Sequence, residues 1–107
     1  MQCLTSNDDI GKIMEQDCYL FFYFTASWCA PCKRIYPEIE QLYLHIKENT
    51  TLNIEFYKID IDENEELCET WKIKGVPTFY LMKQKSLLGN CSGADINAVK
   101  ELFTQCK

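Results

Sequence analysis

Hydrophobic positions along the chain fall into short blocks whose spacing alternates between strand and helix periods. Positions 19–24 are apolar throughout, which predicts a central strand that is buried on both faces. Beyond Pro31 the apolar residues recur at steps of three and four, as in an amphipathic helix. Pro37 lies inside this predicted helix, so we expect a kink there. The apolar positions that define the helix are Ile35, Ile39, Leu42 and Ile46.

The segment before the central strand has the same kind of pattern. Leu4 closes a short first strand, and we expect Thr5 or Ser6 to be the N-cap of the helix that follows. That helix is recognised by a shared apolar face, formed by Ile10, Ile13 and Met14.

The second half of the chain continues the alternation of strands and helices. We expect a strand over positions 54–62, a short acidic helix over 64–71 and a strand over 78–82. A turn at 84–85, a strand over 87–91 and a loop over 92–94 follow, and Asp95 caps a last helix that reaches Phe103. The order of elements predicts an α/β fold, with a central mixed sheet of about five strands flanked by four helices on both faces.

Size and composition describe an ordinary globular domain. The 107 residues are 47% apolar and 25% charged, so we expect one domain over 1–107 with a real core. A net charge of −5 gives no reason to expect nucleic acid or an anionic membrane as a partner. The longest apolar run has six residues, which is too short to span a membrane.

Cysteine usage bears on the compartment. Seven cysteines are an odd count for a disulfide-stapled secreted domain, and the N-terminus has neither a basic start nor an apolar signal core. We therefore expect the reducing cytoplasm.

Two cysteines lie where the central strand ends and the long helix begins. Cys29 is expected at the helix N-terminus, where unpaired N–H groups and the helix dipole lower the pKa of a thiol. Pro31 suits the first turn because its missing N–H would be unpaired there anyway. Two intervening residues bring Cys32 beside Cys29, close enough for a disulfide. Cys29 would then attack a substrate disulfide, and Cys32 would resolve the mixed disulfide.

A zinc half-site and two inert thiols are the other interpretations of this motif. Zinc prefers four ligands. The chain has no second C-x-x-C, and its one histidine, His45, is expected on the surface of the long helix. We therefore expect no metal.

Several motifs together resemble the thioredoxin family along the whole chain, and some look closer to its eukaryotic-type members. The resemblance implies a thioredoxin fold and a monomeric thiol-disulfide oxidoreductase that reduces protein disulfides through a reversible Cys29–Cys32 bond. It also implies recharging by thioredoxin reductase, a flavin enzyme that uses NADPH, with no cofactor in this chain. The matching residues are Trp28-Cys29-Ala30-Pro31-Cys32-Lys33, Pro37, Lys58, Val76-Pro77-Thr78 and Gly93.

The resemblance also assigns a substrate groove. Pro77 would be a cis-proline that faces the cysteine pair, and the backbone of Val76 would pair with an extended substrate segment. Trp28 and the loop around Gly93 would line the same groove. The other interpretations are an ordinary turn proline for Pro77 and core packing for Trp28.

This sequence departs from the family at Tyr23, where the family usually has a buried aspartate that manages the proton of the second cysteine. Tyrosine is a poor base at neutral pH. We therefore expect the proton of Cys32 to be carried by water or with the help of Lys58, and turnover to be slower. Tyr23 is otherwise a core residue. Ala30 also replaces a glycine, and Ala favours the helix.

The other five cysteines are expected to be small buried hydrophobic residues. Cys68 and Cys91 are the first candidates for regulatory thiols among them. The full set is Cys3, Cys18, Cys68, Cys91 and Cys106.

Two other functions stay open. One is a thioredoxin-fold oxidant or disulfide isomerase, and the other is a binding module whose cysteines are dispensable.

Overall fold

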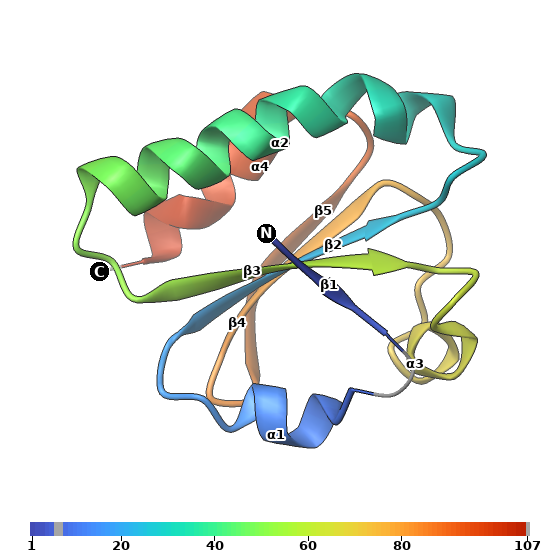
Figure 1. The fold of residues 1–107 in the computed structure, drawn as a ribbon, viewed down its shortest axis with the longest axis horizontal. Helices are drawn as coiled ribbons and strands as arrows, with labels where there is room; N and C mark the ends of the chain where they lie inside the picture. Colours follow the sequence, from blue (N-terminus) through green and yellow to red (C-terminus); the bar gives the residue numbers. More distant parts are fainter. Residues whose placement is uncertain (6–7, 107) are drawn as a thin grey trace.

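A computed structural model describes residues 1–5 and 8–106 of the chain as a sheet between two layers of helices (Figure 1). The predicted order of elements is confirmed, with a short 3-10 helix, η1, added at the end. The strands are β1 (Gln2–Leu4), β2 (Tyr19–Thr25), β3 (Ile54–Asp60), β4 (Thr78–Lys83) and β5 (Ser86–Ser92). The helices are α1 (Ile10–Met14), α2 (Ala30–Asn49), α3 (Glu65–Thr70), α4 (Ile96–Leu102) and η1 (Phe103–Gln105).

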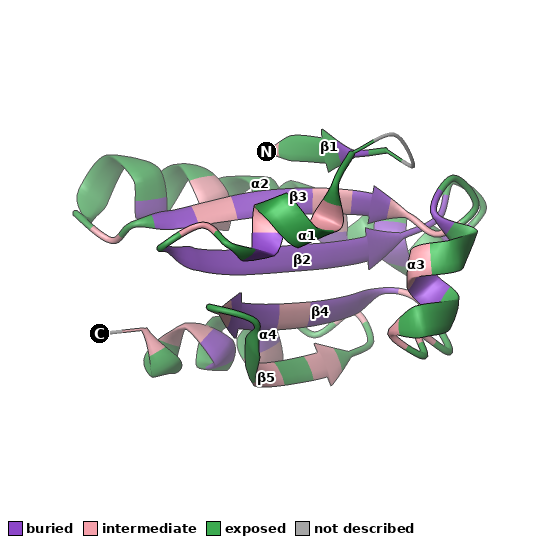
Figure 2. Ribbon diagram, turned by 90° about the horizontal axis from the view of Figure 1, so that it is seen from below, coloured by how far each residue is buried: buried purple, intermediate pink, exposed green. Residues whose placement is uncertain are grey.

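The five strands form one mixed sheet in the order β1-β3-β2-β4-β5. β1 and β2 are both parallel to β3, whereas β4 is antiparallel to its neighbours β2 and β5. β2 therefore lies in the middle, and every one of its residues is buried (Figure 2). The prediction of a central strand buried on both faces is confirmed.

Successive residues of β2 point into two separate cores, because side chains alternate across a strand. Phe21 and Tyr23 pack on the face covered by α2 and α4. Phe22 and Phe24 pack on the opposite face, against α1 and α3. The helices thus cover both faces, as predicted (Figure 1).

The start of α1 differs from the prediction. Asp9 is the N-cap, and its carboxylate accepts the Lys12 N–H at 3.3 Å. Thr5 instead donates its own N–H to the Asp8 carboxylate at 2.8 Å, so the prediction that Thr5 caps this helix is wrong. The alternative cap, Ser6, lies outside the described residues.

Other boundaries shift by a few residues for local reasons. β3 ends at Asp60 and not at Asp62, because the Asp60 carboxylate accepts the Asp62 N–H at 2.9 Å and turns the chain. Phe103 belongs to η1 and not to the last helix. Asp95 caps α4 as predicted, accepting the N–H groups of Asn97 and Ala98. α2 continues through Pro37, where the expected kink stays a prediction.

Candidate active site

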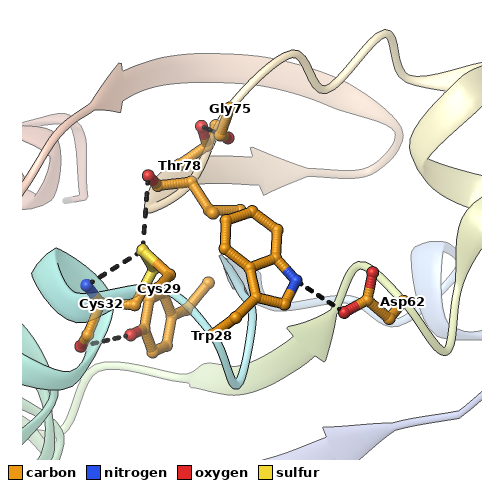
Figure 3. The surroundings of a disulfide bond; sticks show 8 residues. Trp28, Cys29, Cys32, Asp62, Gly75 and Thr78 are labelled. Carbon is orange, nitrogen blue, oxygen red and sulfur yellow. Dashed lines mark hydrogen bonds between the residues drawn. A yellow bond between two sulfur atoms is a disulfide. The ribbon is translucent and has the colours of Figure 1, made fainter.

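The cysteine motif lies at the junction between β2 and α2. Cys29 is the N-cap of α2 and forms a disulfide with Cys32, with the two Cα atoms 5.2 Å apart (Figure 3). The Cys29 sulfur also accepts the Cys32 N–H at 3.2 Å. This position places the first cysteine against the positive end of a 20-residue helix, which stabilises a thiolate. The predicted placement of both cysteines is confirmed.

Both cysteines of the pair are buried. Cys29 retains 5% of its surface and Cys32 retains 1%. Both pack against Ala26, Ile61 and Val76. Cys29 is thus the slightly more exposed residue of the two.

A second loop lies directly beside Cys29. The Val76–Pro77 peptide bond is cis, which confirms that prediction and excludes an ordinary trans turn proline. The carbonyl oxygen of Val76 lies 3.7 Å from the Cys29 sulfur. Pro77 in turn accepts the Gly93 N–H at 2.9 Å, and Gly93 has a φ of +95°, a conformation that favours glycine. The Val76–Pro77 loop thus contacts Cys29 through one residue and Gly93 through the next.

Trp28 directly precedes Cys29 in the chain and lies beside the disulfide (Figure 3). Its side chain is 66% exposed, so the interpretation of Trp28 as a core residue is wrong. The indole N–H donates to the Asp62 carboxylate at 2.9 Å, which fixes the ring beside the disulfide (Figure 3). Asp62 was not among the predicted site residues, because the acidic run around it is also typical of a solvated helix start.

Thr78 belongs to the matching motif, but no role in the site was predicted for it. Its buried hydroxyl donates to the Gly75 carbonyl oxygen at 2.7 Å and lies 3.3 Å from the Ser92 hydroxyl. These contacts brace the Pro77 loop against the loop that carries Gly93. A threonine directly after the cis-proline was the available signal.

A cavity of about 450 Å³ lies behind Cys32, on the α2 face of the sheet. Tyr23 forms part of its lining and has no exposed surface. The Tyr23 hydroxyl donates to the Cys32 carbonyl oxygen at 3.1 Å, and burial raises the pKa of this phenol. Tyr23 is therefore a core residue and also a direct neighbour of the cysteine backbone.

Lys58 lines the same cavity. It pairs in register with Tyr23 across β2 and β3, which confirms that the two residues are neighbours. Its ammonium group lies 4.4 Å from the ring centroid of Tyr36, a cation–π contact. Tyr36 stacks on Tyr23, and Tyr23 stacks on Phe79 at 5.1 Å. The structure thus places a cation near Cys32.

The remaining cysteines are dispersed over the fold. Cys18 and Cys68 are buried and Cys91 and Cys106 partly buried, which agrees with packing roles, but Cys3 is exposed and that expectation is wrong for it. Burial raises the pKa of Cys68 and Cys91, so the thiolate that a regulatory role requires is disfavoured.

His45 is exposed on α2, as predicted. Within the described part of the chain, no group of three or more His, Cys, Asp or Glu residues is arranged to hold a metal ion. No helix in the same residues is long and apolar enough to cross a membrane.

Comparisons with known proteins agree with this geometry. The family model described as Thioredoxin matches residues 3–105. Thioredoxin 1 of Plasmodium falciparum is 33% identical over 103 residues, which cover 96% of this chain and 94% of that protein. A relative named Thioredoxin O1, mitochondrial, from Arabidopsis thaliana is 40% identical over 86 residues, which cover 78% of this chain and 42% of that protein.

The fold comparison gives the same result. The X-ray structure of Fasciola hepatica thioredoxin superposes with a TM-score of 0.87 and is 31% identical, with all of both chains covered. The expected likeness to eukaryotic-type members is confirmed by these organisms. With its disulfide at the matching strand-to-helix junction, the chain belongs to the thioredoxin family of thiol-disulfide oxidoreductases.

Proposed function

We propose that this chain reduces protein disulfides, with Cys29 as the nucleophile and Cys32 as the resolving thiol. The observation that carries the proposal is the position of the Cys29 sulfur, which accepts the Cys32 N–H at the start of α2. In the reduced protein the same N–H and the helix dipole stabilise a thiolate on Cys29. Cys29 is also the slightly more exposed residue of the pair, at 5% against 1%.

The reaction has two thiol-disulfide exchanges. The Cys29 thiolate attacks one sulfur of the substrate disulfide, a Cys29–substrate bond forms, and the first substrate thiol leaves with a proton from solvent. Cys32 then loses its proton and attacks the Cys29 sulfur. The mixed disulfide breaks, the second substrate thiol leaves, and the Cys29–Cys32 disulfide remains. Two electrons have passed from the protein to the substrate.

The groove around Cys29 provides the contacts for an extended substrate. We assign main-chain pairing to Val76, whose carbonyl oxygen already lies beside the reacting sulfur. Pro77 and Gly93 form the floor on either side of their mutual hydrogen bond. Trp28 presents an exposed ring that Asp62 holds in one orientation, which suits it for contact with apolar substrate side chains.

Tyr23 and Lys58 support the second exchange. Tyr23 is a positioning residue, because its hydroxyl holds the Cys32 carbonyl oxygen and is not directed at the sulfur. Lys58 contributes a positive charge to the cavity behind Cys32, which favours the thiolate of the resolving cysteine. Neither group accepts the proton in this scheme, so water in the cavity carries it.

We further propose that the protein acts as a monomer in the cytoplasm and is recharged by thioredoxin reductase. The odd cysteine count and the family membership support this assignment. One relative is named as mitochondrial, so the family alone does not fix the compartment.

The reduction potential of the Cys29–Cys32 pair tests the proposal. We would equilibrate the protein with glutathione buffers, trap the thiols and determine the oxidised fraction by mass spectrometry. A potential well below that of the cytosolic glutathione couple indicates a reductant. A value near or above it indicates an oxidant or isomerase. The absence of a reversible disulfide would indicate a binding module. In that case the double Cys29→Ser, Cys32→Ser variant should keep its cellular function.

A further inference from the structure

The second exchange needs a proton acceptor for Cys32. Cys32 as a whole retains 1% of its surface, so bulk water has little direct access to the residue. A thiol must ionise before it can attack. The proton therefore leaves through the cavity behind Cys32, whose volume of about 450 Å³ has room for several waters at roughly 30 Å³ each. This inference rests on the proposed function.

Most titratable groups that face this cavity are poor acceptors at neutral pH. Burial raises the pKa of both Tyr23 and Tyr36, so their hydroxyls stay protonated. Lys33 and Lys58 are cations and carry no acceptor for a proton. Cys68 on α3 does not line the cavity. The charge of Asp60 raises the pKa of its thiol, but burial is the larger cause.

We propose that Asp60 accepts the proton of Cys32 through water in this cavity. Among the described residues that line the cavity, Asp60 supplies the one carboxylate. It is the last residue of β3, paired in register with Thr25 of β2, and its side chain lies on the same face as that of Lys58 because strand side chains alternate. A base and a cation thus border the same space as the resolving cysteine.

The side-chain hydrogen bond of Asp60 leaves one carboxylate oxygen available to accept a proton. One carboxylate oxygen, Oδ1, accepts the Asp62 N–H at 2.9 Å, which fixes the side chain at the end of the strand. The other oxygen, Oδ2, has no hydrogen-bond partner in the described part of the chain. Asp60 is half-buried, so water can reach it.

The step balances without any further reactant. Cys32 passes its proton to Asp60, and its thiolate attacks the Cys29 sulfur of the mixed disulfide. The Cys29–Cys32 bond forms as the Cys29–substrate bond breaks. The leaving substrate thiolate takes a proton from solvent, and the Asp60 carboxyl returns its own proton to water.

The test follows the lifetime of a mixed disulfide with glutathione. Reduced protein is mixed with glutathione disulfide, quenched with acid and analysed by mass spectrometry between pH 6 and 9. Asp60→Asn keeps an oxygen for the Asp62 N–H but cannot take a proton. We expect its mixed disulfide to decay about 100-fold more slowly near pH 6.5, the lower end of what one general base typically contributes. The difference should close toward pH 9, where Cys32 ionises unaided.

Three controls make the result specific. Glu63→Gln removes an exposed carboxylate from the same loop and should decay like wild type. Asp60→Glu keeps the carboxylate and should restore most of the rate. In a Cys32→Ser background, Asp60→Asn should leave the first exchange within about twofold, because Asp60 acts only on the second.

Contrary results are distinct from one another. Decay of Asp60→Asn at the wild-type rate across the pH range, or equal slowing in Glu63→Gln, would overturn the role of Asp60 and leave the proposed function intact. A Cys32→Ser variant that never forms the mixed disulfide would overturn both.

Discussion

The two sulfurs of one disulfide have different surroundings. Cys29 lies beside main-chain groups, including the Val76 carbonyl oxygen on the loop that is joined to Gly93 by the Pro77–Gly93 hydrogen bond. Cys32 faces a cavity made of side chains, among them Tyr23, Lys58 and Asp60. Main-chain groups are common to every sequence, whereas side chains change with each substitution.

The resemblance to the family differs between these two surroundings. Near Cys29, the positive φ of Gly93 favours the glycine that the resemblance places there. Near Cys32, Tyr23 stands where the resemblance leads us to expect a carboxylate, so the proton chemistry has to be derived from this structure. We therefore expect the attack step to follow the family and the proton step to be specific to this chain.

The largest effect should come from separating the two cysteines. Cys29→Ser should abolish reduction of disulfides at the first step. In the Cys32→Ser variant, Cys29 should still attack the substrate, but no thiol can resolve the mixed disulfide. A mixed disulfide at Cys29 should therefore accumulate to stoichiometric amounts. Mass spectrometry of the protein after exposure to a protein disulfide distinguishes the two. Stable mixed disulfides on Cys32 in the Cys29→Ser variant would reverse the assigned roles.

Truncation of Tyr23 should give the largest loss of stability among changes around the cavity behind Cys32. Tyr23→Ala removes a ring stacked between Tyr36 and Phe79, with an expected loss of about 3–5 kcal/mol in the free energy of unfolding. Tyr23→Phe keeps the ring and removes the hydrogen bond to Cys32, for a loss of about 1 kcal/mol. Urea denaturation measures both. Equal losses would mean that the ring contributes little.

Replacing Trp28 should weaken the binding of protein substrates near Cys29 and leave the exchange chemistry unchanged. Trp28→Ala should lower kcat/KM for a protein disulfide by roughly tenfold, a typical loss for one exposed aromatic contact. Reduction of a small disulfide such as glutathione disulfide should change far less. Leu44→Ala, which truncates an exposed apolar residue of α2 outside the site, serves as the matched control. A similar loss on both substrates would place the role of Trp28 in chemistry and not in binding.

The smallest effect concerns stability at alkaline pH and involves Cys106, which belongs to neither the surroundings of Cys29 nor those of Cys32. Burial raises the pKa of Cys106 from 9.0 to about 11. Above pH 9 the unfolded chain releases this proton while the folded chain keeps it, so stability is present below pH 9 and falls as the pH rises toward 11. Cys106→Ala should flatten that decline in urea denaturation curves. An unchanged slope would show that Cys106 titrates normally.

The sequence is informative where one pattern determines one structure. Six consecutive apolar residues allow few environments other than a central strand, and the cysteine spacing at a helix start predicts a disulfide. The cap of α1 was missed because several polar residues there can accept the same N–H groups. Asp62 and Asp60 were missed for a different reason. Their roles depend on which side chains the fold brings near them, and no local pattern contains that information.

The hydrogen bond from Gly93 to Pro77 joins the two loops that border the groove. Because this amide exchanges its proton with solvent only when the loops part, its rate of deuterium exchange reports how often the groove opens. A bound substrate strand should slow that exchange, whereas chemistry confined to the sulfurs should leave it unchanged. A single backbone amide thus offers a way to observe docking separately from electron transfer.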